Sequence, residues 1–96
     1  MGRVKKGIEP VIYRLEFTHR AAKELKRLDR TTIKRLKARI DTLALDPYDP
    51  RLSKQMETDP DSRYTRVGDW RIIYRVEEAT RTINITAIRP RSRAYK

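Results

Sequence analysis

Arginines and tyrosines in the last third of the chain have the types and the spacing to act on a polyanion. Tyr64 and Arg66 alternate along one predicted strand, and Arg71 lies on the next. Planar guanidinium groups bind phosphate oxygens well, and aromatic rings stack on nucleobases. If the strands are neighbours, four of these side chains converge on the open face of a sheet and form a phosphate site: Arg66, Arg71, Arg91 and Tyr95.

The tyrosine of this set has a second use. Several cations beside a phenol lower its pKa toward working pH, which makes it a proton donor or acceptor. The alternative is that these arginines are solvated strand ends and edge-strand charges that oppose aggregation.

The charge of the chain also favours a negatively charged partner. Lys and Arg number 24 and Asp and Glu 13, so the 96 residues carry a net charge of +11. Because the excess lies in clusters, nucleic acid, a ribosome or an acidic protein is favoured over a role in solubility alone. We expect residues 1–9 to be a flexible basic arm and residues 10–96 to be a single domain.

The composition argues against several kinds of chemistry. The chain has no cysteine and a single histidine, His19, which we expect to be solvated, so no metal site and no cofactor are predicted. The acidic residues near the last strands lie in predicted turns, and the three glycines are too scattered to form a phosphate-binding loop. No stretch has the length of a membrane span or the pattern of a signal peptide, so we expect a cytoplasmic protein without a membrane partner.

The first half of the chain predicts a strand and two helices. Residues 11–17 alternate between apolar and polar side chains, which is typical of a strand. Thr18 and Asp29 are suited to cap two helices with apolar residues at helical spacing, and Pro47 limits the second. Because almost no loop separates them, we expect the helices to form an antiparallel hairpin.

The second half predicts a loop region over 46–61, with Asp-Pro turn signals at 46–47, 49–50 and 59–60 and a short structured piece around Leu52 and Met56. Strands over 64–67, 70–76 and 83–88 follow. Gly68-Asp69 is expected to form the first hairpin turn. The fold class is therefore α+β: an N-terminal strand and a helical hairpin packed on one face of a three- to four-stranded, mainly antiparallel twisted sheet. Alternation along the second of these strands places Arg71, Ile73 and Arg75 opposite Trp70, Ile72, Tyr74 and Val76.

Three segments resemble the RelE/ParE toxin superfamily of type II toxin–antitoxin pairs. They are Tyr-Arg-Leu-Glu-Phe-Thr at 13–18 with the helix start at 21–25, Tyr-Thr-Arg-Val-Gly-Asp-Trp-Arg-Ile-Ile-Tyr at 64–74, and Arg-Ser-Arg-Ala-Tyr-Lys at 91–96. The resemblance covers 11–96 in order, and its ending is most similar to the archaeal-type RelE branch of mRNA interferases. It implies a small α+β toxin whose partner is a cognate antitoxin protein.

The resemblance also implies an activity. RelE-like members are metal-independent, ribosome-dependent endoribonucleases that cleave mRNA in the A site, so the ribosome with its mRNA and rRNA is a second expected partner. The ribose 2′-OH attacks its own phosphate and leaves a 2′,3′-cyclic phosphate and a 5′-OH. Two alternatives stay open: a ParE-like inhibitor of DNA gyrase, and a catalytically weak family member that binds nucleic acid.

By resemblance, Arg71 and Arg91 stabilise the scissile phosphate in the transition state. Tyr95 stacks on the substrate base or transfers a proton, and Arg66 grips the backbone or activates the 2′-OH. The remaining predicted RNA-binding residues are Tyr64, Arg63, Arg75, Arg89, Arg93 and Lys96.

The chain departs from the RelE pattern at two positions. Tyr64 stands where many members have a lysine, and Pro90 stands where other relatives have a histidine, so neither of the usual strong bases is present. The identity of the general base is open. The basic residues of the helical hairpin are candidates for antitoxin or rRNA contact, or form a solvated face: Lys23, Lys26, Arg27, Lys34, Arg35, Lys37 and Arg39.

Overall fold

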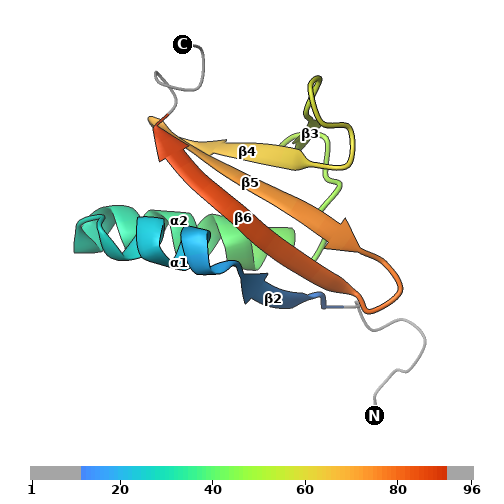
Figure 1. Ribbon diagram of the computed structural model, residues 1–96, viewed down its shortest axis with the longest axis horizontal. Coiled ribbons are helices and arrows are strands. Elements are labelled where there is room, and N and C mark those ends of the chain that lie inside the picture. Colours follow the sequence, from blue (N-terminus) through green and yellow to red (C-terminus); the bar gives the residue numbers. More distant parts are fainter. Residues whose placement is uncertain (1–11, 91–96) are drawn as a thin grey trace.

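The computed structural model describes residues 12–90, which form two helices and one five-stranded sheet. The strand order across the sheet is β2-β6-β5-β4-β3, with β2 parallel to β6 and the other neighbours antiparallel (Figure 1). In chain order the elements are β2 (Arg14–Phe17), α1 (His19–Lys26), α2 (Arg30–Leu43), β3 (Lys54–Gln55), β4 (Arg63–Val67), β5 (Trp70–Glu77) and β6 (Thr82–Pro90).

The predicted α+β class and element order are confirmed, but the strand count was too low. The additional strand is β3, whose two residues pair with Tyr64 and Arg63 of β4. β3 lies within the short structured piece expected around Leu52 and Met56, but a strand of two residues is too short to show the period-two pattern that would identify it as a strand. The first strand is also shorter than predicted, because Tyr13 N donates to Ala44 O at 2.9 Å instead of joining the sheet.

Each helix begins at a side chain that accepts from a free backbone N–H. Thr18 Oγ1 accepts from Ala21 N at 3.1 Å, and Asp29 Oδ2 accepts from Thr32 N at 3.2 Å. Caps of this kind contribute about 1 kcal/mol each to stability. Because residues 27–29 alone separate the helices, α1 and α2 run in opposite directions, as predicted (Figure 1).

The core lies between the helical hairpin and the sheet. The predicted alternation along β5 is confirmed, since Ile72 and Tyr74 are fully buried while Arg75 is exposed. The Tyr74 hydroxyl donates to Pro47 O at 2.7 Å, and burial raises the pKa of this phenol. The buried apolar side chains that meet here include Leu36, Ile40, Leu43, Ile72, Tyr74, Ile83 and Ile85.

A two-residue turn, Gly68-Asp69, joins β4 to β5 and confirms the predicted hairpin. Gly68 has a φ of 59°, whereas Asp69 has a negative φ, which is the pattern of a type II′ turn. This left-handed conformation is one that glycine adopts without strain.

We expect Gly68→Ala to lower the free energy of unfolding by about 1–2 kcal/mol, because an L side chain is strained at this φ. The added Cβ would lie 2.8 Å from Arg35 Nη2, but that flexible group can move away, so the backbone strain dominates. Urea denaturation measures the loss. Gly68→Asn is the matched control and should lose less, because asparagine tolerates the left-handed region. Equal losses would contradict this explanation.

Candidate nucleic-acid interface

Three arginines form a row across the sheet, called here the arginine row: Arg66, Arg71 and Arg89. Arg66 of β4 lies directly opposite Arg71 of β5, and Arg71 lies directly opposite Arg89 of β6. Residues in register share a face, and this face is the one turned away from the core residue Ile72. Guanidinium groups placed side by side in this way can bind an anion that lies across the row.

Arg71 is held in place by Tyr64. The Arg71 Cζ atom lies 4.3 Å from the centroid of the Tyr64 ring, and the arginine is only 8% exposed. A cation over an aromatic face contributes about 0.5–2 kcal/mol and limits the rotamers of the guanidinium. Tyr64, which replaces the expected lysine, therefore helps to pre-position the arginine at the centre of the row.

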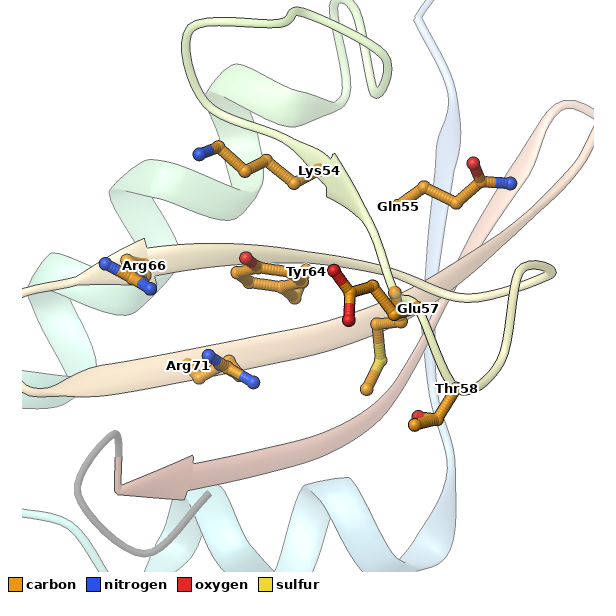
Figure 2. Close-up of a pocket in the computed structure, with 8 residues that line it drawn as sticks. Lys54, Gln55, Glu57, Thr58, Tyr64, Arg66 and Arg71 are labelled. Carbon is orange, nitrogen blue, oxygen red and sulfur yellow. The ribbon is translucent and has the colours of Figure 1, made fainter. Parts of the chain in front are cut away.

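Two members of the arginine row, Arg66 and Arg71, lie beside a cavity (Figure 2). The volume of this cavity is about 540 Å³. Tyr64, Arg66 and Arg71 line it from the sheet, and the other wall comes from β3 and the loop that follows. The structure thus brings together two of the predicted catalytic residues and one predicted RNA-binding residue. The residues of the second wall are Lys54, Gln55, Met56, Glu57 and Thr58.

The residues of this second wall were not predicted as site residues. Lys54 and Glu57 contribute a cation and a carboxylate, yet both lie in the region predicted to be a loop. The sequence around these two residues has no periodic pattern. The short pairing of β3 with β4 is what brings them to the same cavity as Arg71. The structured piece expected around Leu52 and Met56 provides part of this wall, but nothing in its sequence indicated the face on which it packs.

Arg39 of α2 reaches the same strand from the core side. Its Nη1 donates to Thr65 Oγ1 and to Arg66 O, both at 2.7 Å. The sequence placed Arg39 among the basic residues available to a partner, but the structure shows it half-buried against β4. It also lines a smaller cavity of about 200 Å³ that shares Lys54, Tyr64 and Arg66 with the larger one.

Arg89 and Arg63 differ in their surroundings. Arg89 completes the arginine row, and its Nε is buried without a hydrogen-bond partner within residues 12–90. Arg63 lies on the helix side of the sheet, where its Nε donates to Ser53 Oγ at 2.7 Å and its guanidinium lies 5.3 Å from the Tyr48 ring centroid. The structure therefore brings Arg89 to the interface and does not bring Arg63 there.

Arg75 shares the face of Arg71 but lies at the other end of β5. Its Nη2 forms an ion pair of 3.0 Å with Asp59 Oδ2, and both side chains are about half exposed. The Ser62 hydroxyl, followed by Arg75, holds the pKa of Asp59 below its ordinary value. Arg75 is therefore engaged with the loop and does not line the cavity beside the arginine row.

Several predictions concern residues outside the described range of 12–90. They are the basic arm over 1–9, which also sets the start of the predicted domain, and four site residues: Arg91, Arg93, Tyr95 and Lys96. Their assignments stay predictions.

No metal cluster is present in the described part of the chain: no three His, Cys, Asp or Glu side chains there are grouped to hold an ion. His19 is exposed at the start of α1. No helix within 12–90 has the length and apolar character needed to cross a bilayer.

Known proteins share this fold and sequence pattern. A family model, described as the ParE toxin of the type II toxin–antitoxin system parDE, matches residues 15–95. The RelE–RelB complex from Pyrococcus horikoshii OT3 contains a chain 27% identical to this one, with a TM-score of 0.72 over 85% of this chain and 98% of that one. The RelBE2 complex from Mycobacterium tuberculosis gives 23% identity, a TM-score of 0.76, and coverage of 85% and 94%. A search of curated protein sequences found no match.

The YoeB/ParE toxin from Agrobacterium tumefaciens has the same fold at 15% identity, with a TM-score of 0.70 over 80% of this chain and 96% of that one. The fold, the family model and the solved structures together identify the protein as a small α+β toxin of the RelE/ParE superfamily. The chain belongs to the ParE toxin family of type II toxin–antitoxin systems, whose model covers most of its length. This confirms the superfamily resemblance, while the archaeal-type branch stays a prediction.

We expect Arg39→Met to lower the free energy of unfolding by about 1–3 kcal/mol, because two charge-assisted hydrogen bonds to β4 are lost. Chemical denaturation measures this change. Lys37→Met is the matched control, since it removes the same charge from an exposed position of the same helix. Its expected change is within about 0.5 kcal/mol. If both variants lost the same stability, the bracing of β4 by Arg39 would be unsupported.

Proposed function

We propose that this toxin is a ribosome-dependent endoribonuclease that cleaves mRNA in the A site. The observation that carries the proposal is the arginine row, with Arg71 buried against Tyr64 at the edge of a cavity. A phosphodiester in the cavity would accept charge-assisted hydrogen bonds from these guanidinium groups. The site would act in the cytoplasm, where translation takes place.

The chemistry follows from the charge of the transition state. The ribose 2′-oxygen attacks the adjacent phosphorus, the bond from phosphorus to O5′ breaks, and a 2′,3′-cyclic phosphate and a 5′-OH result. Negative charge grows on the non-bridging oxygens as the 2′-oxygen attacks. Arg66 and Arg71 are held on a rigid sheet, so they can stabilise that charge without rearranging, and one such donor contributes about 3–4 kcal/mol. These arginines supply the positive charge that a metal provides in other nucleases.

Residues outside the described range complete the proposal. By the family pattern, Arg91 is a second clamp on the scissile phosphate, and Tyr95 stacks on the base or passes a proton. Arg89 lies beside Arg71 and would hold a neighbouring phosphate. Arg63 and Arg75 have partners within the protein, so we propose that they contribute mainly to the long-range positive potential.

The ribosome has two roles in this proposal. It holds the mRNA in the geometry for in-line attack, which can lower the barrier by several kcal/mol through orientation alone. It also attracts the toxin, because a protein with a net charge of +11 associates rapidly with ribosomal RNA, and increasing salt weakens that attraction.

A cognate antitoxin is the second proposed partner. The solved relatives from P. horikoshii and M. tuberculosis are toxin–antitoxin complexes. The exposed cations of the helical hairpin, among them Lys23, Lys26 and Lys34, would pair with an acidic antitoxin segment or with rRNA.

Gyrase inhibition is the alternative, and the match to the ParE model favours it. A gyrase inhibitor acts through a protein–protein contact. It has no need for Arg71 to be stacked on Tyr64 at the edge of a cavity, so this geometry favours RNA cleavage over gyrase inhibition.

We expect the wild-type protein to cut a message in the ribosomal A site, and Arg71→Ala to reduce the cleavage rate about 10²- to 10³-fold, because one pre-positioned donor is lost. Primer extension after translation in a reconstituted system maps and quantifies the cuts. Arg14→Ala removes the same charge from an exposed position on β2 and should leave the rate within a few-fold.

An uncut message together with gyrase-trapped DNA breaks would support the alternative. No effect in either assay would indicate a family member that binds nucleic acid without inhibiting growth.

A further inference from the structure

Cleavage through the 2′-OH requires a group that accepts its proton, and neither usual base is present at Tyr64 or Pro90. Of the cavity residues, Lys54, Glu57 and Tyr64 carry groups that can in principle accept one. Lysine and tyrosine side chains must first lose a proton of their own, whereas a carboxylate is ready to accept one at neutral pH. The acidic residue is therefore the first candidate for the base.

We infer that Glu57 is the general base of the cleavage reaction, an inference that rests on the proposed endoribonuclease function. Glu57 is the carboxylate among the residues that line the cavity within the described chain. Figure 2 shows its side chain extending from the loop after β3 toward Tyr64, on the side where Arg66 and Arg71 lie. The residue thus faces the space that a bound phosphodiester would occupy.

The Glu57 carboxylate is also uncommitted, unlike its acidic neighbours. Within residues 12–90, Glu57 makes no hydrogen bond and no ion pair. Asp59, two residues later, accepts from Ser62 Oγ at 2.7 Å and pairs with Arg75. A carboxylate in this cavity repels a bound polyanion and so weakens its binding. A role in proton transfer would explain why a carboxylate is nevertheless present there.

The loop that carries Glu57 is held by its own hydrogen bonds. Met56 N donates to Ser62 O at 3.0 Å, and Gln55 Nε2 donates to Pro60 O at 2.8 Å. These bonds close the loop on itself next to the pairing of β3 with β4. The carboxylate is therefore presented to the cavity from a defined position, as a group that must reach a substrate hydroxyl requires.

The proposed step balances without a co-reactant. Glu57 takes the proton of the 2′-OH while the 2′-oxygen forms its bond to phosphorus. The bond from phosphorus to O5′ breaks, and O5′ takes up a proton from water. Glu57 then returns its proton to solvent, while Arg66 and Arg71 hold the negative charge on the phosphate oxygens.

Glu57→Gln tests this role, because the amide keeps the shape of the side chain and cannot accept the proton. We expect single-turnover A-site cleavage to slow about 10²- to 10⁴-fold and the acidic limb of the pH–rate profile to disappear. Ribosome binding should be unchanged or tighter, because a negative charge is removed. Glu16→Gln makes the same change on exposed β2 and should leave the rate, the profile and the binding unaltered.

Two further variants separate Glu57 from the other proton acceptors. Tyr64→Phe keeps the ring beneath Arg71, and Lys54→Met keeps most of the side-chain length. If Glu57 is the base, both variants keep the acidic limb of the pH–rate profile. Loss of that limb in either one, with Glu57→Gln unaffected, would overturn the inference and assign the base to that residue.

The two hypotheses fail in different ways. If the wild-type protein cuts the message and Glu57→Gln cuts it at the same rate with the same pH profile, Glu57 is a surface carboxylate and the nuclease proposal stands. If the wild-type protein leaves the message uncut, the nuclease proposal and the role of Glu57 fall together. Matching thermal unfolding midpoints would show that the variants are folded.

Discussion

The register of the β4–β5 hairpin determines where the arginine row lies. A two-residue turn places Val67 opposite Trp70, and this pairing brings Arg66 opposite Arg71. Because side chains alternate along a strand, a shift of one residue would move one of these arginines into the core. The left-handed conformation at Gly68 therefore sets the strand register as well as the turn, and this register places Arg66 and Arg71 on the same face.

The wall of the cavity depends on the core. Tyr74 is fully buried, and its hydroxyl binds the carbonyl of Pro47. That contact holds Pro47 at the start of the segment that leads into β3. The same segment pairs with β4 and places Lys54 and Glu57 at the cavity. From the opposite side, Arg39 binds the backbone of Arg66. The buried Tyr74 hydroxyl and the Arg39 side chain of α2 therefore both hold the parts of the chain that form the interface.

Local patterns were enough to predict the helices, their caps, the hairpin turn and the face on which Arg71 lies. They failed where position depends on contacts distant in sequence. Arg75 lies on the same face of β5 as Arg71, but four residues of a strand place the two about 13 Å apart. At that position Arg75 forms an ion pair with Asp59. Arg63 and Arg66 lie on opposite faces of β4, and Arg63 is on the face of the sheet that the helices cover. The two-residue β3 has no periodic signal, so the wall that contains Glu57 could not be predicted.

The parallel pairing of β2 with β6 has a consequence for synthesis of the toxin. Arg14 is in register with Thr82, so the first and last described strands are neighbours in the sheet. Contacts between residues so far apart form late, because a long stretch of chain must first be ordered. During translation β6 leaves the ribosome after all the other described strands, and until then the sheet lacks the strand that joins β2 to β5. The arginine row can therefore assemble only after the chain has emerged from the ribosome as far as β6, so the site forms later than the helices that support it.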